Sequence, residues 1–268
     1  MIEVRTMRQI LCYGDSNTYG LVPKENARYP WGIRWTSRLN EKLGLQQYRV
    51  IEEGLCGRTT VFDDPFRDHR NGAKFVNAVL ETHGASDLII LMLGTNDCKT
   101  AYKTTPQLIG KGVETVIAKI RSFAPDSKIL LVSPIHLGEK VWEKSYDPEF
   151  SRESVDVSKG LADVYAEIAR NEHLYFLDAS DVAAPSDTDQ EHLNEEEHGV
   201  YRRGRNARSV SPAKNQSITD YRRATGFEAL IGHLYLTGQY ERLTELVSIG
   251  LESIEKEIKE KGAEHAGK

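Results

Sequence analysis

Three short polar motifs in this chain carry the residue types that acyl transfer requires. In chain order they are Gly14–Thr18 (GDSNT), Gly94–Asp97 (GTND) and Asp189–His192 (DQEH). Together they supply a serine nucleophile, an amide donor for a developing oxyanion, and a histidine base with a carboxylate to orient it. The set predicts a serine esterase.

Each motif also has a simpler interpretation when it is taken alone. The run around Ser16 is typical of an ordinary turn, because Gly, Asp, Ser and Asn all favour turns. Asn96 is a turn-forming residue after the most apolar predicted strand. A phosphate-binding loop is disfavoured because no Gly-Lys-Ser/Thr sequence follows the first motif. The ordered combination is what favours the catalytic interpretation.

The histidine motif leaves two alternatives open. Asp189 precedes His192 by three residues on one predicted loop, so its carboxylate can fix the imidazole tautomer. The surrounding segment is acidic, however, and a D-x-x-H match is common in such a segment. His198 is a competing base, and Asp187 is a competing carboxylate.

Five runs rich in apolar and β-branched residues must position these motifs. They cover residues 9–13, 48–53, 87–93, 128–132 and 174–177. Helical periodicity lies between them, as in 108–120 and 161–168. The alternation predicts an α/β fold with a parallel, doubly wound sheet. Ligands gather at the carboxyl ends of such strands, and Ser16, Gly54 and Asn96 each follow a predicted strand.

Composition indicates a protein without membrane segments. The 268 residues are 39% hydrophobic and 28% charged, and the net charge of −5 gives no overall attraction to nucleic acid. The three cysteines are scattered, which argues against a disulfide framework and for a reducing compartment. The N-terminus lacks the apolar region of a signal peptide, and no apolar run approaches a spanning helix. We therefore expect a cytoplasmic protein.

The composition changes near residue 200. A basic run follows, with the candidate RNA-contacting residues Arg202, Arg203, Arg205, Arg208 and Lys214. Two helical patterns, at 226–236 and 241–261, come after it, and no strand is predicted beyond residue 177. We therefore predict two domains, 1–199 and a helical appendage at 200–268.

Residues 8–199 resemble the SGNH (GDSL-type) hydrolases, in the arylesterase/acyltransferase branch that includes perhydrolases. Besides the serine and histidine motifs, the matching stretches are Ile33–Trp35, Val50–Leu55, Arg58–Thr60, Asp63–Pro65, Asn71–Ala73 and Leu93–Asp97. The resemblance implies a flavodoxin-like three-layer α/β/α fold with a five-stranded parallel sheet.

The same resemblance assigns roles to residues. Ser16, His192 and Asp189 would form the catalytic triad. The oxyanion hole would combine the amides of Ser16 and Gly54 with the side chain of Asn96. No metal or cofactor is implied, and the substrates would be short-chain acyl or aryl esters.

Residues 193–261 instead resemble the C-terminal half of mini-ribonuclease III, so the chain looks like a hybrid. The resemblance rests on Arg202–Arg208, Pro212–Asn215, Asp220–Arg222 and Thr225–Gly232. In that family the Arg-rich loop handles double-stranded RNA, and the position of Glu228 holds a metal-binding carboxylate. The family's second acidic block has no counterpart here, so Glu228 is an isolated carboxylate and no metal is expected.

The combined expectation is a serine esterase or acyltransferase that acts on a small-molecule ester through an acyl-serine intermediate. The C-terminal basic loop would make weak contact with double-stranded RNA. The alternative is a double-stranded-RNA-binding or ribonuclease III-like module in rRNA processing, with the esterase part inert. The sequence leaves the oligomeric state open, a homo-oligomer included.

Overall fold

The computed structural model describes residues 7–193 of the chain. The chain divides into two compact units, Met1–Glu195 and Glu196–Lys268, and the described residues lie in the first. The predicted boundary at 199, the basic run and Glu228 lie outside the described residues.

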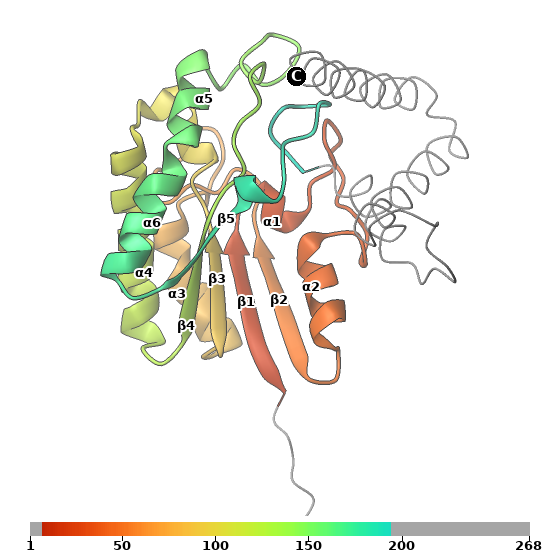
Figure 1. Cartoon of the computed structure of the whole chain (residues 1–268), viewed down its shortest axis with the longest axis vertical. Coiled ribbons are helices and arrows are strands. Elements are labelled where there is room, and N and C mark those ends of the chain that lie inside the picture. The colour runs from red at the N-terminus through yellow and green to blue at the C-terminus, as the bar shows by residue number, and fades with distance from the viewer. Residues whose placement is uncertain (1–6, 194–268) are drawn as a thin grey trace, which may run out of the picture. The chain divides into compact units, whose positions relative to one another are not determined.

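A five-stranded parallel sheet organises this unit (Figure 1). Its strands are β1 (Arg8–Gly14), β2 (Tyr48–Gly54), β3 (Leu88–Met92), β4 (Lys128–Ser133) and β5 (Tyr175–Asp178). They lie in the order β2-β1-β3-β4-β5, and every neighbouring pair is parallel. This is the flavodoxin-like order of a doubly wound sheet. The predicted fold class and all five predicted strands are confirmed.

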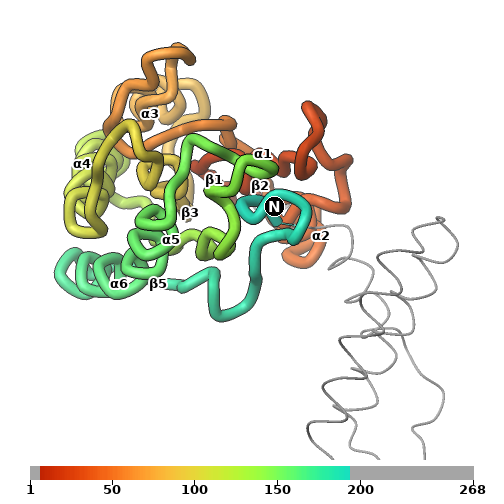
Figure 2. Tube along the Cα trace, turned by 90° about the horizontal axis from the view of Figure 1, so that it is seen from above, coloured from red at the N-terminus to blue at the C-terminus, as the bar shows by residue number. Residues whose placement is uncertain are grey.

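Helices cover both faces of the sheet (Figure 2). They are α1 (Ser16–Tyr19), α2 (Trp35–Leu43), α3 (Gly72–His83), α4 (Pro106–Phe123), α5 (Arg152–Lys159) and α6 (Leu161–Asn171). Short 3₁₀ turns lie before α4, at η1 (Asn96–Cys98) and η2 (Thr100–Tyr102), and after β5, at η3 (Ala179–Asp181). Helix α4 begins with Pro106, and the Thr105 hydroxyl accepts a hydrogen bond from the Leu108 amide at 3.3 Å. Both features are typical of a helix N-terminus.

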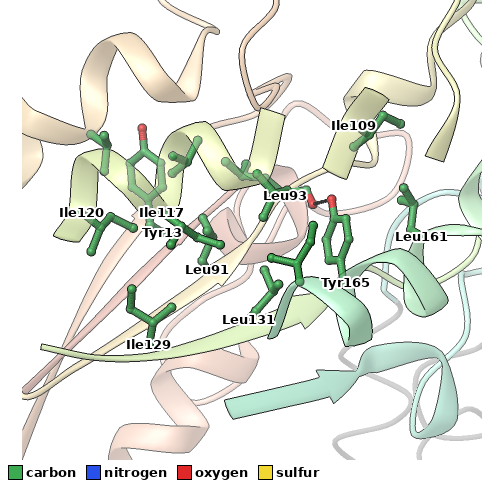
Figure 3. Close-up of a cluster of buried hydrophobic side chains, with 14 of the residues drawn as sticks. Tyr13, Leu91, Leu93, Ile109, Ile117, Ile120, Ile129, Leu131, Leu161 and Tyr165 are labelled. Atoms are coloured by element: carbon green, nitrogen blue, oxygen red, sulfur yellow. Dashed lines mark hydrogen bonds between the residues drawn. The ribbon is translucent and has the colours of Figure 1, made fainter. Parts of the chain in front are cut away.

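The two faces of the sheet carry separate apolar clusters. On one face Leu91, Leu131 and Tyr13 pack against α3, α4 and α6 (Figure 3). On the other face Cys12, Ile90 and their neighbours pack against α2. Strand β3 is apolar throughout because both of its faces are covered. This explains why its sequence shows no polar alternation.

The last strand, β5, is less covered than the rest of the sheet. Tyr175 is 58% exposed, and Phe176 and Leu177 are also exposed. Elsewhere in residues 7–193, Cys12, Cys56 and Cys98 are free thiols. Within the same residues, no helix combines the length and apolar character needed to cross a membrane.

Candidate active site

The candidate site lies where β1 and β3 end, at the point where the strand order reverses. Ser16 is the first residue of α1, directly after β1. Asp15 caps this helix by accepting a hydrogen bond from the Asn17 amide at 3.0 Å. The Ser16 amide has no acceptor within residues 7–193, as is usual for the first amide of a helix. It is therefore available to a ligand.

Ser16, His192 and Asp189 form a continuous hydrogen-bonded chain. The distance from Ser16 Oγ to His192 Nε2 is 2.8 Å, and that from His192 Nδ1 to Asp189 Oδ2 is 2.7 Å. All three residues are buried. The second oxygen of Asp189 accepts from the amide of His192 at 2.9 Å. The structure thus brings the three predicted catalytic residues together, whereas the competitor His198 lies outside the described residues.

Asn17 holds the histidine loop against the serine loop. Its Oδ1 accepts from the Leu193 amide at 3.0 Å, and its Nδ2 donates to the Glu191 carbonyl at 3.5 Å. These two partners flank His192 in the chain. The sequence around Ser16 indicates only a turn-forming role for Asn17, and no local signal reveals this contact.

Asn96 begins η1, directly after the loop that follows β3. Its Nδ2 donates to the carbonyl of Arg58 at 3.2 Å. A primary amide has two N–H groups, so the second remains available for an oxyanion. The neighbouring Asp97 accepts from the Thr60 amide at 3.0 Å. Two adjacent residues therefore tie the loop after β3 to the loop after β2.

Arg58 connects the carboxyl ends of β1 and β2 beside the site. Its buried guanidinium donates to the carbonyl of Gly14 at 2.7 Å and also to the carbonyl of Glu53. It lies 4.2 Å from the ring centroid of Tyr13. Burial lowers the pKa of Arg58 from its usual value. Arg58 lies in the Arg58–Thr60 stretch that resembles the esterase family, but the sequence alone indicates no role for it.

Besides the amide of Ser16, the oxyanion needs a second backbone donor. The amides of Gly54 and Gly57 are both candidates for it. A Cβ atom on Gly54 would lie 2.1 Å from the Tyr19 amide nitrogen, so glycine lets α1 approach β2. The next amide, that of Leu55, donates to Gly14 at 3.1 Å, so the Gly54 amide faces away from β1. Gly57 is buried at a φ of 81°, and its amide has no acceptor within residues 7–193.

Buried carboxylates control the ionisation of the histidine. Burial opposes protonation of His192, but Glu191 and Asp189 outweigh it and raise the pKa of His192 to about 9. Burial also acts against ionisation of Asp189, yet its hydrogen bond to His192 and the histidine charge hold the pKa of Asp189 below its usual value. His192 and Asp189 thus stabilise each other's charged forms.

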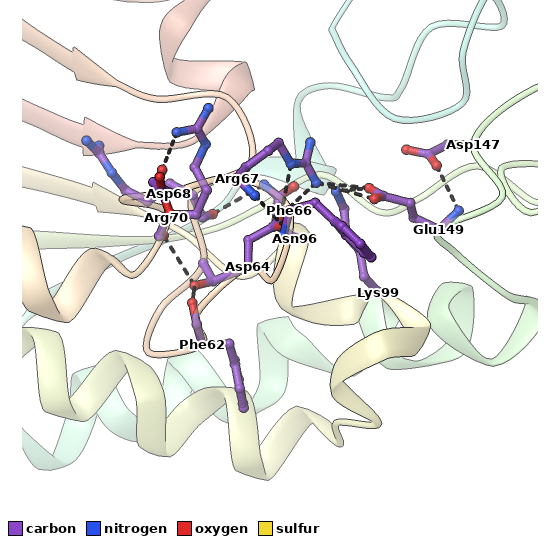
Figure 4. A network of polar contacts seen from close by, with 12 residues as sticks. Phe62, Asp64, Phe66, Arg67, Asp68, Arg70, Asn96, Lys99, Asp147 and Glu149 are labelled. Carbon is purple, nitrogen blue, oxygen red and sulfur yellow. Dashed lines mark hydrogen bonds and ion pairs between the residues drawn. The ribbon is translucent and has the colours of Figure 1, made fainter.

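A network of charged side chains lies beside Asn96 (Figure 4). Glu149 pairs with Lys99 and, at 3.1 Å, with Arg67. Arg67 also pairs with Asp64 at 2.8 Å. The neighbouring Phe66 is 88% exposed. The surface beside Asn96 therefore carries these charged side chains and the exposed ring of Phe66.

A separate cavity of about 260 Å³ adjoins Arg58 and is lined by Glu53, His69, Phe75 and His83 among others. None of Ser16, His192 and Asn96 lines it. We place the chemistry at Ser16, because the nucleophile and base meet there. Within the described part of the chain, no group of three or more His, Cys, Asp or Glu side chains is arranged to hold a metal ion.

Comparison with known proteins gives two separate results for this chain. Residues 12–198 match the GDSL-like Lipase/Acylhydrolase family. A carbohydrate acetylesterase family member from Sinorhizobium meliloti is 32% identical with a TM-score of 0.67, over 84% of this chain and 99% of that one. The native M. smegmatis aryl esterase is 30% identical with a TM-score of 0.64, over 88% of this chain and 99% of that one.

The second result is a similarity to mini-ribonuclease 3. The protein of Clostridium tetani is 48% identical over 79 residues, which are 30% of this chain and 52% of the relative. The protein of Enterococcus faecalis is 59% identical over 58 residues, 22% of this chain and 44% of the relative. The chain thus spans about half the length of these curated relatives. The predicted hybrid character is confirmed.

Proposed function

This chain belongs to the GDSL-like lipase/acylhydrolase family, and we propose from that premise that it is a serine esterase that forms an acyl-enzyme on Ser16. The observation that carries the proposal is the hydrogen-bonded chain from Ser16 through His192 to Asp189. A serine hydroxyl is a weak nucleophile until a neighbouring base accepts its proton. Here that base and its orienting carboxylate are already in place.

The reaction begins when Ser16 Oγ attacks the ester carbonyl carbon and transfers its proton to His192 Nε2. Asp189 stabilises the resulting imidazolium. Collapse of the tetrahedral intermediate breaks the bond to the alcohol oxygen, which takes the proton from Nε2. Water, or another alcohol acting as acyl acceptor, then attacks the acyl-serine by the same steps in reverse. Hydrolysis and acyl transfer therefore differ only in the acceptor.

The oxyanion is stabilised by the backbone amide of Ser16 and the second N–H of Asn96. The Gly57 amide suits the third position better than the predicted Gly54 amide, because Gly57 adjoins the carbonyl that orients Asn96. A crystal structure with a phosphonate bound to Ser16 would decide between them. The assignment to Gly57 requires its nitrogen within hydrogen-bonding distance of the phosphonyl oxygen.

Short-chain acyl esters are the proposed substrates. Support comes from the similar structures, which are an aryl esterase and a carbohydrate acetylesterase family member. The charged side chains around Asn96 favour alcohol portions that are polar rather than long and aliphatic.

Hydrolysis of p-nitrophenyl acetate with and without a chelator tests the proposal. We expect turnover that the chelator leaves unchanged, and Ser16→Ala should remove nearly all of it. Ser133→Ala is the matched control, since Ser133 is an equally buried serine at the end of β4. Retained activity in Ser16→Ala, with unchanged labelling by a phosphonate, would refute the proposal.

Weak binding of double-stranded RNA is a second proposed property, favoured by the similarity to mini-ribonuclease 3. The basic residues Arg202, Arg203, Arg205, Arg208 and Lys214 would contact phosphates. Cleavage is not proposed, because a two-metal site requires several carboxylates and Glu228 has no identified partner.

A further inference from the structure

Glu191 is a buried carboxylate next to the reacting atoms, and the proposed reaction gives it no role. It is 7% exposed. Its Oε1 lies 3.7 Å from His192 Nε2, which is beyond hydrogen-bonding distance. Within residues 7–193 the carboxylate forms an ion pair with His192 but makes no hydrogen bond with a side chain or an amide. Burying a carboxylate whose hydrogen bonds are not completed is costly, so a ligand that completes them would be bound strongly.

The turn that carries Glu191 is fixed by the residues of the site. The Glu191 amide donates to Asp189 Oδ1 at 3.1 Å, and the Glu191 carbonyl accepts from Asn17. Gln190, at a φ of 64°, donates its amide to Ser186 at 2.8 Å. The main chain that carries Glu191 is therefore held by the same contacts that position His192.

Burial raises the pKa of Glu191, and the positive charge of His192 acts against this effect. After burial, the charges act in both directions: Lys99 also lowers the pKa of Glu191, whereas Asp147 and Asp189 raise it. Lys99 is paired with Glu149. Whether ionised or protonated, the carboxyl group can accept a hydrogen bond from a hydroxyl.

The leaving alcohol oxygen must approach Nε2 to receive its proton, and Glu191 lies beside that position. We propose that Glu191 binds a hydroxyl group on the carbon next to the esterified one, so that the substrates are partial esters of polyols or sugars. This inference rests on the proposed esterase function and deepens it. Glu191 would act on specificity, since it accepts a hydrogen bond from the part of the substrate that leaves.

A matched pair of substrates tests the inference. 2-Hydroxyethyl acetate and propyl acetate are similar in size and differ by a hydroxyl in place of a methyl group. We expect the unaltered chain to hydrolyse the hydroxylated ester with a kcat/KM about 10-fold higher or more, the effect of one hydrogen bond to a charged group. In Glu191→Leu this ratio should fall to about one. Glu53→Leu, which removes a carboxylate that pairs with His83 instead, should preserve the ratio.

The ratio also separates this inference from the proposed function. A change in the ionisation of His192 affects both esters equally and cancels in the ratio. If both esters are hydrolysed and Glu191→Leu leaves their ratio unchanged, the inference fails while the esterase function stands. If neither ester nor p-nitrophenyl acetate is hydrolysed, the esterase function itself fails. A preference for acetylcholine that is lost in Glu191→Leu would overturn the hydroxyl assignment in favour of a cation.

Discussion

The side-chain amide of Asn96 donates a 3.2 Å hydrogen bond to the main-chain carbonyl of Arg58. This contact fixes the amide plane, so that the second N–H of Asn96 has one orientation. The guanidinium of the same Arg58 holds the carbonyls of Gly14 and Glu53 at the ends of β1 and β2. One residue therefore connects the serine loop, the loop after β2 and the loop after β3.

Arg58→Lys should consequently lower kcat more than it changes KM. A lysine keeps the charge but cannot hold both carbonyls in the same geometry. The oxyanion donors should therefore shift away from the positions in which they contact the oxyanion. We expect a loss in kcat of about 10-fold to 100-fold, less than the removal of a donor. Steady-state kinetics with p-nitrophenyl acetate measures it.

Arg34→Lys is the control for this variant. Arg34 is also a buried arginine, but it pairs with Glu52 at 2.7 Å and contacts none of the oxyanion donors. Its replacement should lower the thermal midpoint with little effect on kcat. Equal losses of kcat in both variants would mean that Arg58 is only structural.

Asn96→Ala should lower kcat by about 10²-fold to 10³-fold with a smaller effect on KM, because the oxyanion forms only during the reaction. The measurement is kcat and KM for the same ester. An effect confined to KM would mean that Asn96 helps to bind the substrate but does not stabilise the oxyanion.

His192→Ala should abolish turnover, whereas His198→Ala should not. His192 bonds to both Ser16 and Asp189, which are needed for proton transfer. Initial rates of the two variants, with circular dichroism to confirm folding, give the comparison. The opposite result would make His198 the base, six positions later in the chain, and Asp189 would not be the carboxylate that orients it.

The pH profile of kcat/KM should shift when Glu191 is replaced. His192 acts as a base only when neutral, and its pKa is raised to about 9, so kcat/KM should rise with pH until about that value. Glu191→Gln removes one of the charges that favour the imidazolium, so the rise should move to lower pH. Glu53→Gln should leave the profile in place; an unshifted profile in Glu191→Gln would contradict this account.

The raised pKa of His192 has the corresponding effect on stability. Since the folded pKa of about 9 exceeds the ordinary value of 6.5, protonation of His192 favours the folded state. This contribution is fully present below pH 6.5 and is lost as the pH rises through about 9. Thermal midpoints measured across this range for the unaltered chain and His192→Gln should converge at high pH.

Binding of double-stranded RNA should be weak, should fall steeply with salt and should not lead to cleavage. Phosphate contacts made by arginine and lysine release counterions, which gives the salt dependence. A filter-binding titration and a cleavage assay with magnesium and a long duplex measure both properties. Magnesium-dependent cleavage that disappears in Glu228→Gln would overturn this expectation.

Local sequence patterns were sufficient to predict the sheet. Each predicted strand differs from the observed strand by no more than a residue at either end, and β3 illustrates why. An unbroken apolar run is a property of consecutive residues, and it can be read without knowing what covers it. The pairing of Asp189 with His192 is similarly local, because three residues on one tight turn bring the two side chains within reach.

Only the tertiary structure decided the contacts between loops that are distant in the chain. Ser16 and His192 are 176 positions apart, Asn17 and Glu191 are 174 apart, and Arg58 and Asn96 are 38 apart. No periodicity or spacing encodes such contacts, since they depend on how helices and strands pack and on where each loop leaves the sheet. The burial of Glu191 beside Nε2 and the position of the Gly57 amide follow from that packing. The sequence by itself therefore determined the fold and the chemical groups, and the packing of the loops decided which groups meet.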